Sequence, residues 1–241
     1  MINIFKYLIL CLLALVVGVA VWMSIPYPHQ HAAAEQALQS TTGITVNREG
    51  YLSFAPQLRT HVGLIIYPGG KTSADTFAPL AHNFAIHGLF VAVVPMPLNT
   101  AFLGINKAND VIEQHPEIDT WFIAGHSLGG VAAAEYAKSA NDKLAGLMFW
   151  ASYPGSDISH LTLPVLSIVA DKDLQSTPVK IASHQEKMPE RTEFSYIEGG
   201  NHWHFAHFAD TLNEQHDLIS RTEQQNLVLR HTLDFVSKVA D

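Results

Sequence analysis

The chain has 241 residues, with 14 Lys and Arg against 22 Asp and Glu, and a formal net charge of −8. This acidic balance argues against sequence-independent binding of nucleic acid, which needs a basic face. Hydrophobic residues make up 48% and charged residues 15% of the chain, which argues against intrinsic disorder. The length suits one large domain, or one domain with an appendage. The single cysteine, Cys11, leaves no intrachain disulfide and no Cys-x-x-Cys site.

Residues 1–28 are predicted to form a membrane anchor. The chain carries no charged residue from Tyr7 to Ile25, and a helix of that length reaches roughly 28 Å, close to the thickness of the hydrocarbon core of a bilayer. Lys6 precedes this run, and the next Lys or Arg is Arg48. The positive-inside rule therefore places the N-terminus in the cytoplasm and the following domain outside it.

Two other interpretations of this segment stay open. One is a signal peptide cleaved at the small-x-small motif Gly18-Val19-Ala20, which would leave a secreted or periplasmic domain. The other is a helix buried in the core. The apolar run is long for a signal peptide and continues past the motif, and Trp22 and Tyr27 lie where an outer aromatic belt is expected. These features favour the anchor.

Residues 29–42 are predicted to be a polar connector, with a short helix as an alternative for part of it, and residues 43–241 one domain. The segment Ile44–Phe54 is a predicted hairpin around Arg48-Glu49-Gly50. Short apolar runs then recur, and several are nearly continuous, as expected for strands buried on both faces of a sheet. These runs are Val62–Tyr67, Leu89–Val94, Trp121–Ala124, Leu144–Trp150, Val165–Ala170 and Phe194–Ile197.

Helical patterns lie between these runs. The alternation predicts an α/β fold with a mostly parallel central sheet and helices on both faces. In such sheets, functional sites form at the carboxyl ends of the strands. The predicted helices are Asp75–His87, Leu103–His115, Leu128–Ser139, Pro178–Lys187 and Glu223–Val239.

The strongest candidate for chemistry follows the predicted strand Trp121–Ala124. Gly125-His-Ser-Leu-Gly129 is a Gly-x-Ser-x-Gly motif between a predicted strand and a predicted helix, which is the context of a nucleophile elbow. Ser127 is therefore the predicted nucleophile. The N–H of Leu128, at a helix N-terminus, would point to a developing oxyanion. The alternative is a glycine-rich helix N-cap without chemistry.

A serine nucleophile needs a base and an acid that orients the base. The chain order Ser, acid, His is available after the later strands. Asp171 and Asp173 both follow Val165–Ala170, and position alone does not separate them. His202 follows Phe194–Ile197 in a glycine-rich loop and is the predicted base.

Two rival kinds of site are considered and not favoured. His204 and His207 follow His202 and raise a metal-binding alternative, but no His-Glu-x-x-His motif or Cys partner lies nearby, so no metal is expected. The loop Pro68-Gly-Gly-Lys71 fails the spacing of a phosphate-binding loop. It is instead the candidate for a second oxyanion donor, and because Pro68 has no N–H, the donor would be Gly70 or a neighbour.

In combination and in this order, the segments resemble the α/β-hydrolase superfamily. The resemblance is closest to its small, cap-less subgroup named alpha/beta hydrolase fold-5, related to dienelactone-hydrolase-like enzymes, and it spans roughly residues 43 to 208. One departure is Pro68, where many relatives outside the subgroup carry His before the Gly. The segments that carry the resemblance are Tyr67-Pro-Gly-Gly-Lys71, Val94-Pro-Met-Pro-Leu-Asn99, Gly125-His-Ser-Leu-Gly-Gly130, Ala151-Ser-Tyr-Pro154, Ala170-Asp-Lys-Asp173 and Ile197-Glu-Gly-Gly-Asn-His202.

The resemblance implies a serine hydrolase that acts on an ester or similar acyl bond without a cofactor. It implies Ser127 as nucleophile, His202 as base and Asp173, rather than Asp171, as the orienting acid, with Gly70 and Leu128 as oxyanion donors. An acyltransferase with the same triad and a non-catalytic binding protein of this fold remain alternatives. The expected partners are a small-molecule acyl ester and a membrane, not nucleic acid, and the oligomeric state stays open.

Overall fold

The computed structural model describes residues 2–213 and 218–240. Its strands form one eight-stranded sheet in the order β1-β2-β4-β3-β5-β6-β7-β8. The strands are β1 (Ile44–Asn47), β2 (Leu52–Pro56), β3 (Val62–Tyr67), β4 (Phe90–Val93), β5 (Thr120–His126), β6 (Leu144–Trp150), β7 (Val165–Ala170) and β8 (Glu193–Ile197). The strand β2 pairs antiparallel with β1 and β4, and the strands from β3 to β8 pair parallel. The predicted hairpin and the mostly parallel sheet are confirmed.

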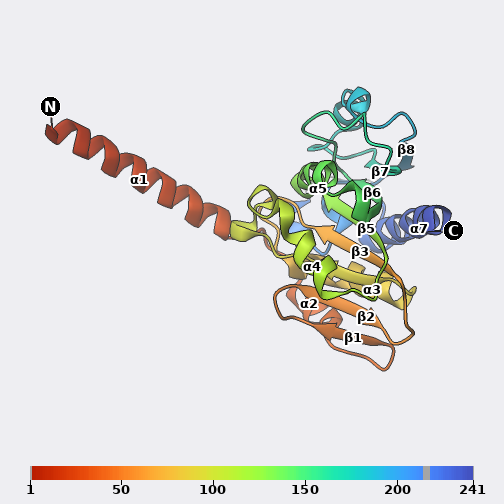
Figure 1. Cartoon of the computed structure of the whole chain (residues 1–241). Coiled ribbons are helices and arrows are strands. Elements are labelled where there is room, and N and C mark those ends of the chain that lie inside the picture. The colour runs from red at the N-terminus through yellow and green to blue at the C-terminus, as the bar shows by residue number, and fades with distance from the viewer. Residues whose placement is uncertain (1, 214–217, 241) are drawn as a thin grey trace.

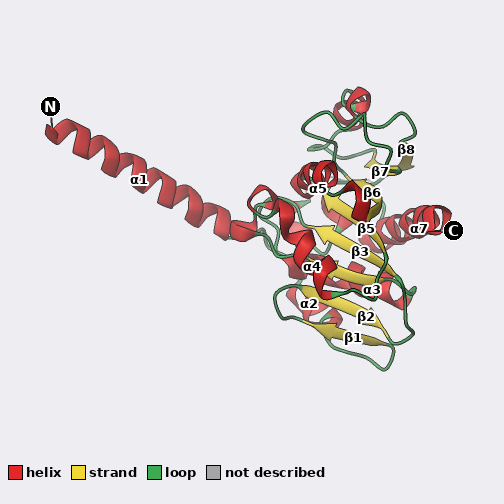
Figure 2. Cartoon of the chain, in the orientation of Figure 1, coloured by secondary structure: helices red, strands yellow, loops and turns green. Residues whose placement is uncertain are grey.

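Helices cover both faces of this sheet, as the alternation of elements predicts (Figures 1 and 2). One face is packed by α2, α3 and α7, and the other by α4, α5 and α6. The helices are α1 (Ile2–Ser24), α2 (His31–Ala37), α3 (Ala78–Ile86), α4 (Ala108–Gln114), α5 (Leu128–Ser139), α6 (Pro178–Ala182) and α7 (Arg221–Ala240).

The central strands are apolar throughout because both of their faces are buried. In β3, Leu64 and Ile66 belong to the core under α3 and α7, whereas Ile65 and Tyr67 belong to the core under α4 and α5. Successive side chains of a strand point to opposite faces, so a two-layered core requires a continuous apolar run. All four of these side chains are fully buried.

Two of the predicted helices are shorter in the structure than the sequence pattern indicates. The predicted helix Leu103–His115 is wrong in its first half, where two 3-10 turns, Ala101–Leu103 and Ile105–Lys107, precede α4. Gly104 between these turns has φ −134° and ψ 25°, and a Cβ there would lie 2.7 Å from the Met96 sulfur. The predicted helix Pro178–Lys187 ends as α6 at Ala182.

The helix α1 stands apart from the layers and leaves the body of the domain as one extended helix (Figure 1). Its segment Phe5–Ser24 is long and apolar enough to cross a membrane, with a mean hydropathy of 2.5, and none of it is buried in the structure. The alternative of a buried core helix is therefore wrong. A signal sequence would meet the same length and composition.

Two segments outside the sheet complete the fold, one before β1 and one between β6 and β7. The helix α2 buries Ala34 and, just beyond it, Leu38 against the domain, although it lies in the predicted connector. Residues 151–164, between β6 and β7, form a loop without helix or strand. This loop therefore provides no folded lid over the carboxyl ends of the strands.

The buried aromatic stack under α3 gives a test of the fold. Phe84 is fully buried, and its ring lies 5.9 Å from that of Trp150 at an interplanar angle of 14°. We expect Phe84→Ala to lower the free energy of unfolding by about 3–5 kcal/mol, because it removes this packing and leaves a cavity. Urea unfolding of the full chain in detergent, followed by tryptophan fluorescence, measures the change.

The matched control is Ile86→Ala in the same helix, since 63% of the Ile86 side chain is exposed. It is expected to change the free energy of unfolding by less than about 0.5 kcal/mol. Equal losses for the two variants would contradict the assignment of Phe84 to the core.

Candidate active site

The turn between β5 and α5 holds Ser127 in a backbone conformation that few residues adopt. Its φ is 53° and its ψ is −125°, which for a residue with a side chain costs about 1–3 kcal/mol. Two hydrogen bonds, one to the last residue of β6 and one from the segment just after β6, hold the turn in place. The Ser127 N–H donates to the Trp150 carbonyl at 3.1 Å, and the Ser152 hydroxyl donates to the Ser127 carbonyl at 2.6 Å.

The glycines of the motif are required by close backbone contacts. A Cβ on Gly125 would lie 2.3 Å from the backbone of Gly129. A Cβ on Gly129 would lie 2.0 Å from the Tyr67 carbonyl oxygen at the end of β3. These distances are shorter than real Cβ contacts, so the spacing of the motif follows from how tightly β3, β5 and α5 meet.

The structure pairs His202 with Asp173. The Nδ1 atom of His202 lies 2.7 Å from Oδ2 of Asp173, and both side chains are buried. The other carboxylate oxygen, Oδ1, accepts the backbone N–H groups of Gln175 at 2.7 Å and Ser176 at 2.8 Å. A carboxylate only accepts, so Nδ1 of His202 donates to it, and Nε2 is the ring nitrogen left for another partner.

Asp171, the other candidate acid, lies elsewhere. Its Oδ2 is 3.7 Å from Nζ of Lys172, and its backbone N–H donates to the Ile197 carbonyl at 3.2 Å. Of these two aspartates, which position along the chain does not separate, Asp173 is the one whose carboxylate contacts the His202 imidazole.

The loop that carries His202 is tied to α7 through two fully buried residues. Gln224 accepts the N–H of Asn201 at 2.9 Å and donates to the carbonyl of Asn201 at 2.8 Å. The Asn201 side chain in turn accepts the N–H groups of Trp203 at 2.9 Å and His204 at 3.1 Å. Both flanks of His202 are therefore held by hydrogen bonds from within the core.

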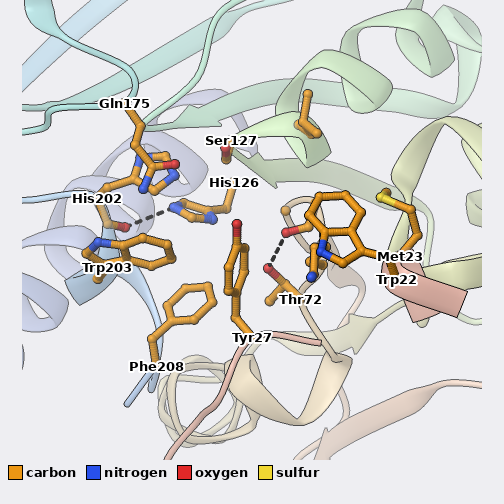
Figure 3. A pocket seen from close by; sticks show the side chains of 14 residues that line it. Trp22, Met23, Tyr27, Thr72, His126, Ser127, Gln175, His202, Trp203 and Phe208 are labelled. Atoms are coloured by element: carbon orange, nitrogen blue, oxygen red, sulfur yellow. Dashed lines mark hydrogen bonds between the residues drawn. The ribbon is translucent and has the colours of Figure 1, made fainter. Parts of the chain in front are cut away.

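A cavity of about 350 Å³ joins the candidate residues (Figure 3). Ser127 and His202 line it, and so do Gly70 and Leu128. Leu128 is the first residue of α5, so its N–H has no acceptor within the helix. Gly70 packs against Leu128, since a Cβ on Gly70 would lie 2.7 Å from Cδ1 of Leu128. The structure thus brings Ser127, His202, Gly70 and Leu128 to one cavity, and Asp173 is bonded to His202 behind it.

His126 is a residue of the site that the sequence analysis did not single out. It is fully buried, its Nε2 lies 3.1 Å from the carbonyl oxygen of His202, and its ring centroid lies 4.6 Å from that of His202. Burial, together with the nearby His202, holds the pKa of His126 well below its usual range. The imidazole is therefore neutral and donates from Nε2 to the His202 backbone. The sequence feature that could have pointed to His126 is its position beside Ser127 in the Gly-x-Ser-x-Gly motif.

The N-terminal segment also contributes to the cavity, which the sequence analysis did not foresee. Trp22, Met23 and Tyr27 line it together with Ser127 and His202. Figure 3 shows Tyr27 standing between Trp203 and Phe208 on one side and Trp22 on the other. The sequence placed Trp22 and Tyr27 only in an aromatic belt, because a linear pattern does not show which later loop they meet.

His204 and His207, the residues of the metal alternative, are held by other contacts. The Nδ1 atom of His207 lies 3.3 Å from Nε2 of Gln225. Burial lowers the pKa of both histidines, and the nearby Arg221 lowers it further. Among the residues that the structure describes, no three His, Cys, Asp or Glu side chains are grouped so as to hold a metal ion.

Comparison with known proteins places this arrangement in a family. The model of the alpha/beta hydrolase family matches residues 63–226, which is more than half of the chain. Cutinase 1 of Thermobifida cellulosilytica and a cutinase of Thermobifida fusca are each 24% identical over 174 residues. The match covers 65% of this chain, but only 65% and 57% of the lengths of the two cutinases.

Solved structures share the fold. A carboxylesterase of Bacillus subtilis superposes with a TM-score of 0.60 at 11% identity, over 86% of this chain and 96% of that chain. A monoacylglycerol lipase of Paleococcus ferrophilus superposes with a TM-score of 0.55 at 12% identity, over 72% of this chain and 94% of that chain. The expected α/β-hydrolase fold is thereby confirmed.

The partly buried His207 predicts how stability depends on pH. The pKa of His207 is lowered from 6.5 to about 4, so between these pH values the unfolded chain binds a proton that the folded protein does not. We expect the free energy of unfolding to fall as the pH drops from 7 to 4.5. His207 accounts for about 1–2 kcal/mol of this fall in the free energy of unfolding, a value reduced because the ring is partly exposed and screened by water.

The variant His207→Gln tests this share, since it cannot be protonated. Denaturant unfolding at pH 7 and pH 4.5 should show a smaller acid-induced loss for His207→Gln than for the native chain. His160→Gln, at an exposed histidine, should leave the loss as it is. An unchanged loss in His207→Gln would contradict the prediction.

Proposed function

Because the chain belongs to the alpha/beta hydrolase family, we propose that it is a serine hydrolase that cleaves an ester or related acyl bond. The observation that carries this proposal is the buried His202–Asp173 pair, joined at 2.7 Å, whose His202 lines the same cavity as Ser127. A strained serine at a strand–helix turn, beside a histidine oriented by a carboxylate, supports nucleophilic catalysis.

The proposed reaction has two stages. Ser127 Oγ attacks the substrate carbonyl while Nε2 of His202 takes its proton, and Asp173 stabilises the imidazolium. The N–H groups of Leu128 and Gly70 stabilise the oxyanion. His202 then protonates the leaving alcohol, which leaves an acyl group on Ser127. In the second stage His202 takes a proton from water and the water oxygen attacks the acyl carbonyl. The bond between the acyl carbon and Ser127 Oγ then breaks, His202 returns the proton to Oγ, and the free acid departs.

Ester bonds are favoured over other acyl bonds by the relatives. Two of them are cutinases, and the superposed structures are a carboxylesterase and a monoacylglycerol lipase. The family's mechanism requires no cofactor or metal, and the chain's own residues supply the nucleophile, base and acid. The acyltransferase alternative uses the same first stage and differs only in which hydroxyl attacks the acyl group.

We place the domain at a membrane, held by an uncleaved α1 with the catalytic part outside the cytoplasm. The apolar and unburied segment Phe5–Ser24 supports a membrane span, and Lys6 on its N-terminal side supports the orientation. In this proposal residues 1–28 are the anchor and residues 43–241 the hydrolase domain. Cleavage of a signal peptide would instead release the domain.

A fluorophosphonate probe and p-nitrophenyl esters test the nucleophile. We expect the native chain to be labelled and to hydrolyse the esters, and Ser127→Ala to lose labelling and at least about 10³-fold in kcat. Circular dichroism of both proteins serves as the folding control. A native chain that is not labelled, or a Ser127→Ala chain labelled equally, would remove the enzyme interpretation. Product analysis with an added alcohol separates hydrolysis from acyl transfer.

The two aspartates provide a matched pair for the acid. Asp173→Asn should lower kcat by about 10²–10⁴-fold, because the amide no longer orients and stabilises the protonated imidazole. Asp171→Asn, two positions earlier in the same turn, should change kcat less than about twofold, because the Asp171 carboxylate lies beside Lys172 and not against the imidazole. Loss of activity in Asp171→Asn with retention in Asp173→Asn would reverse the assignment.

A further inference from the structure

The end of α1 and the residues after it are bonded to the loop that carries the proposed oxyanion donor. We call Trp22–Tyr27 the foot of the anchor. The Tyr27 N–H donates to the Lys71 carbonyl at 2.6 Å, and the Lys71 N–H donates to the Asn99 carbonyl at 2.8 Å. The Asn99 side chain donates to the Ser24 carbonyl at 2.9 Å, at the C-terminus of α1. The foot is therefore joined to the loop beside Gly70.

Backbone conformation at this junction indicates a built contact. Lys71, Leu98 and Asn99 all have φ between 49° and 55°, in the left-handed region that favours glycine. Such conformations persist where the surrounding structure determines them. At this junction they turn the two loops so that their carbonyl and amide groups meet the foot.

Side chains of the foot form one wall of the cavity. The ammonium of Lys71 lies 3.9 Å from the centre of the Trp22 ring, and the Tyr27 ring lies 5.4 Å from that of Trp203, the neighbour of His202. Trp22, Met23 and Tyr27 line the same cavity as Ser127 (Figure 3). A substrate in this cavity would therefore touch the last turn of α1.

The foot also determines where the cavity lies relative to a bilayer. The 23 residues of α1 extend roughly 35 Å, enough to cross the hydrocarbon core and end in the headgroup region. Tryptophan and tyrosine prefer that region, and Trp22 is 58% exposed although it lines the cavity. The ester groups of membrane lipids lie at the same depth, between the acyl chains and the headgroups.

Apolar side chains beside the foot extend this surface. Leu98, Phe102 and Leu103 lie in the 3-10 turns that follow β4, and 42% to 58% of each is exposed. The first of these turns contacts α1. Leu128, which lines the cavity, is 40% exposed. An exposed apolar group beside the end of a membrane helix matches a lipid surface.

We propose that the substrates are acyl ester lipids of the bilayer that holds α1, taken up past the foot into the cavity. This inference rests on the proposed function. The ester C–O bond breaks and the acyl group is transferred to Ser127, while His202 protonates the leaving alcohol oxygen. Water then releases the fatty acid. A cavity of about 350 Å³ is at the small end of ligand sites, so it admits the ester and part of one chain while the rest stays in the bilayer.

The full chain reconstituted in phosphatidylcholine vesicles tests the source of the substrate. One arm places a monooleoylglycerol in the vesicles that hold the protein, and the other places it in separate vesicles. We expect hydrolysis at least about tenfold faster in the first arm, because anchoring raises the effective concentration of lipid in the same bilayer. Equal rates in the two arms would overturn the inference.

Variants of the foot test its role as a cavity wall. The double variant Trp22→Ser, Met23→Ser should lower the ratio of monooleoylglycerol hydrolysis to p-nitrophenyl acetate hydrolysis by about tenfold, through lost contacts with the acyl chain. Leu12→Ala, in the same helix and exposed, should leave the ratio within about twofold. An unchanged ratio in the double variant would contradict the inference.

The reference ester separates this inference from the proposed function. If p-nitrophenyl acetate is hydrolysed in a Ser127-dependent way but the lipid in the same bilayer is not, the hydrolase stands and the lipid inference fails. If neither ester is hydrolysed, or hydrolysis persists in Ser127→Ala, the proposed function itself fails. Recovery of the chain from cells as a soluble form without residues 1–20 would also overturn the inference, because α1 would then hold no bilayer.

Discussion

The backbone turn at Ser127 is the constraint on which the rest of the site depends. A residue with a side chain holds φ 53° there only because β3, β5 and α5 approach so closely that Gly125 and Gly129 have no room for a Cβ. This packing presents the serine hydroxyl at the carboxyl edge of the sheet and the Leu128 N–H at the start of a helix. The strain of one residue is thus offset by the packing of three buried elements.

The proposed acid and base are oriented by backbone groups rather than by exposed charges. Two N–H groups hold the Asp173 carboxylate, and Gln224 and His126 hold the loop on which His202 lies. Buried polar groups are costly unless they are paired. Other orientations of the Asp173 carboxylate and of the His202 loop would break these hydrogen bonds and are therefore disfavoured. Because Nδ1 of His202 is bonded to Asp173, Nε2 is the ring nitrogen that the proposed mechanism uses for proton transfer.

The N-terminal segment is part of the proposed site and not a tether alone. Its foot is hydrogen-bonded to the loop beside Gly70 and lines the cavity that Ser127 lines. In the proposed arrangement, anchoring and substrate access are linked, since the helix that would hold the protein in a bilayer ends against the cavity that Ser127 and His202 line. A free-floating domain would need neither the strained turn at Asn99 nor the ring contact of Lys71 with Trp22.

Local patterns in the sequence determined the apolar span, the parallel strands and the motif around Ser127, because hydrophobic periodicity and glycine spacing act over a few neighbouring residues. They did not predict the break at Gly104, where a Cβ would lie 2.7 Å from the Met96 sulfur, because hydrophobic periodicity does not show such a close approach. Nor could they choose Asp173 over Asp171, since both follow the same strand, and the family resemblance was needed. The tertiary structure decided three contacts: that of the Asp173 carboxylate with His202, that of His126 with the His202 backbone, and that of the foot of α1 with the cavity. Each of these depends on contacts between residues far apart in the chain, which only the packing of the sheet and its loops brings together.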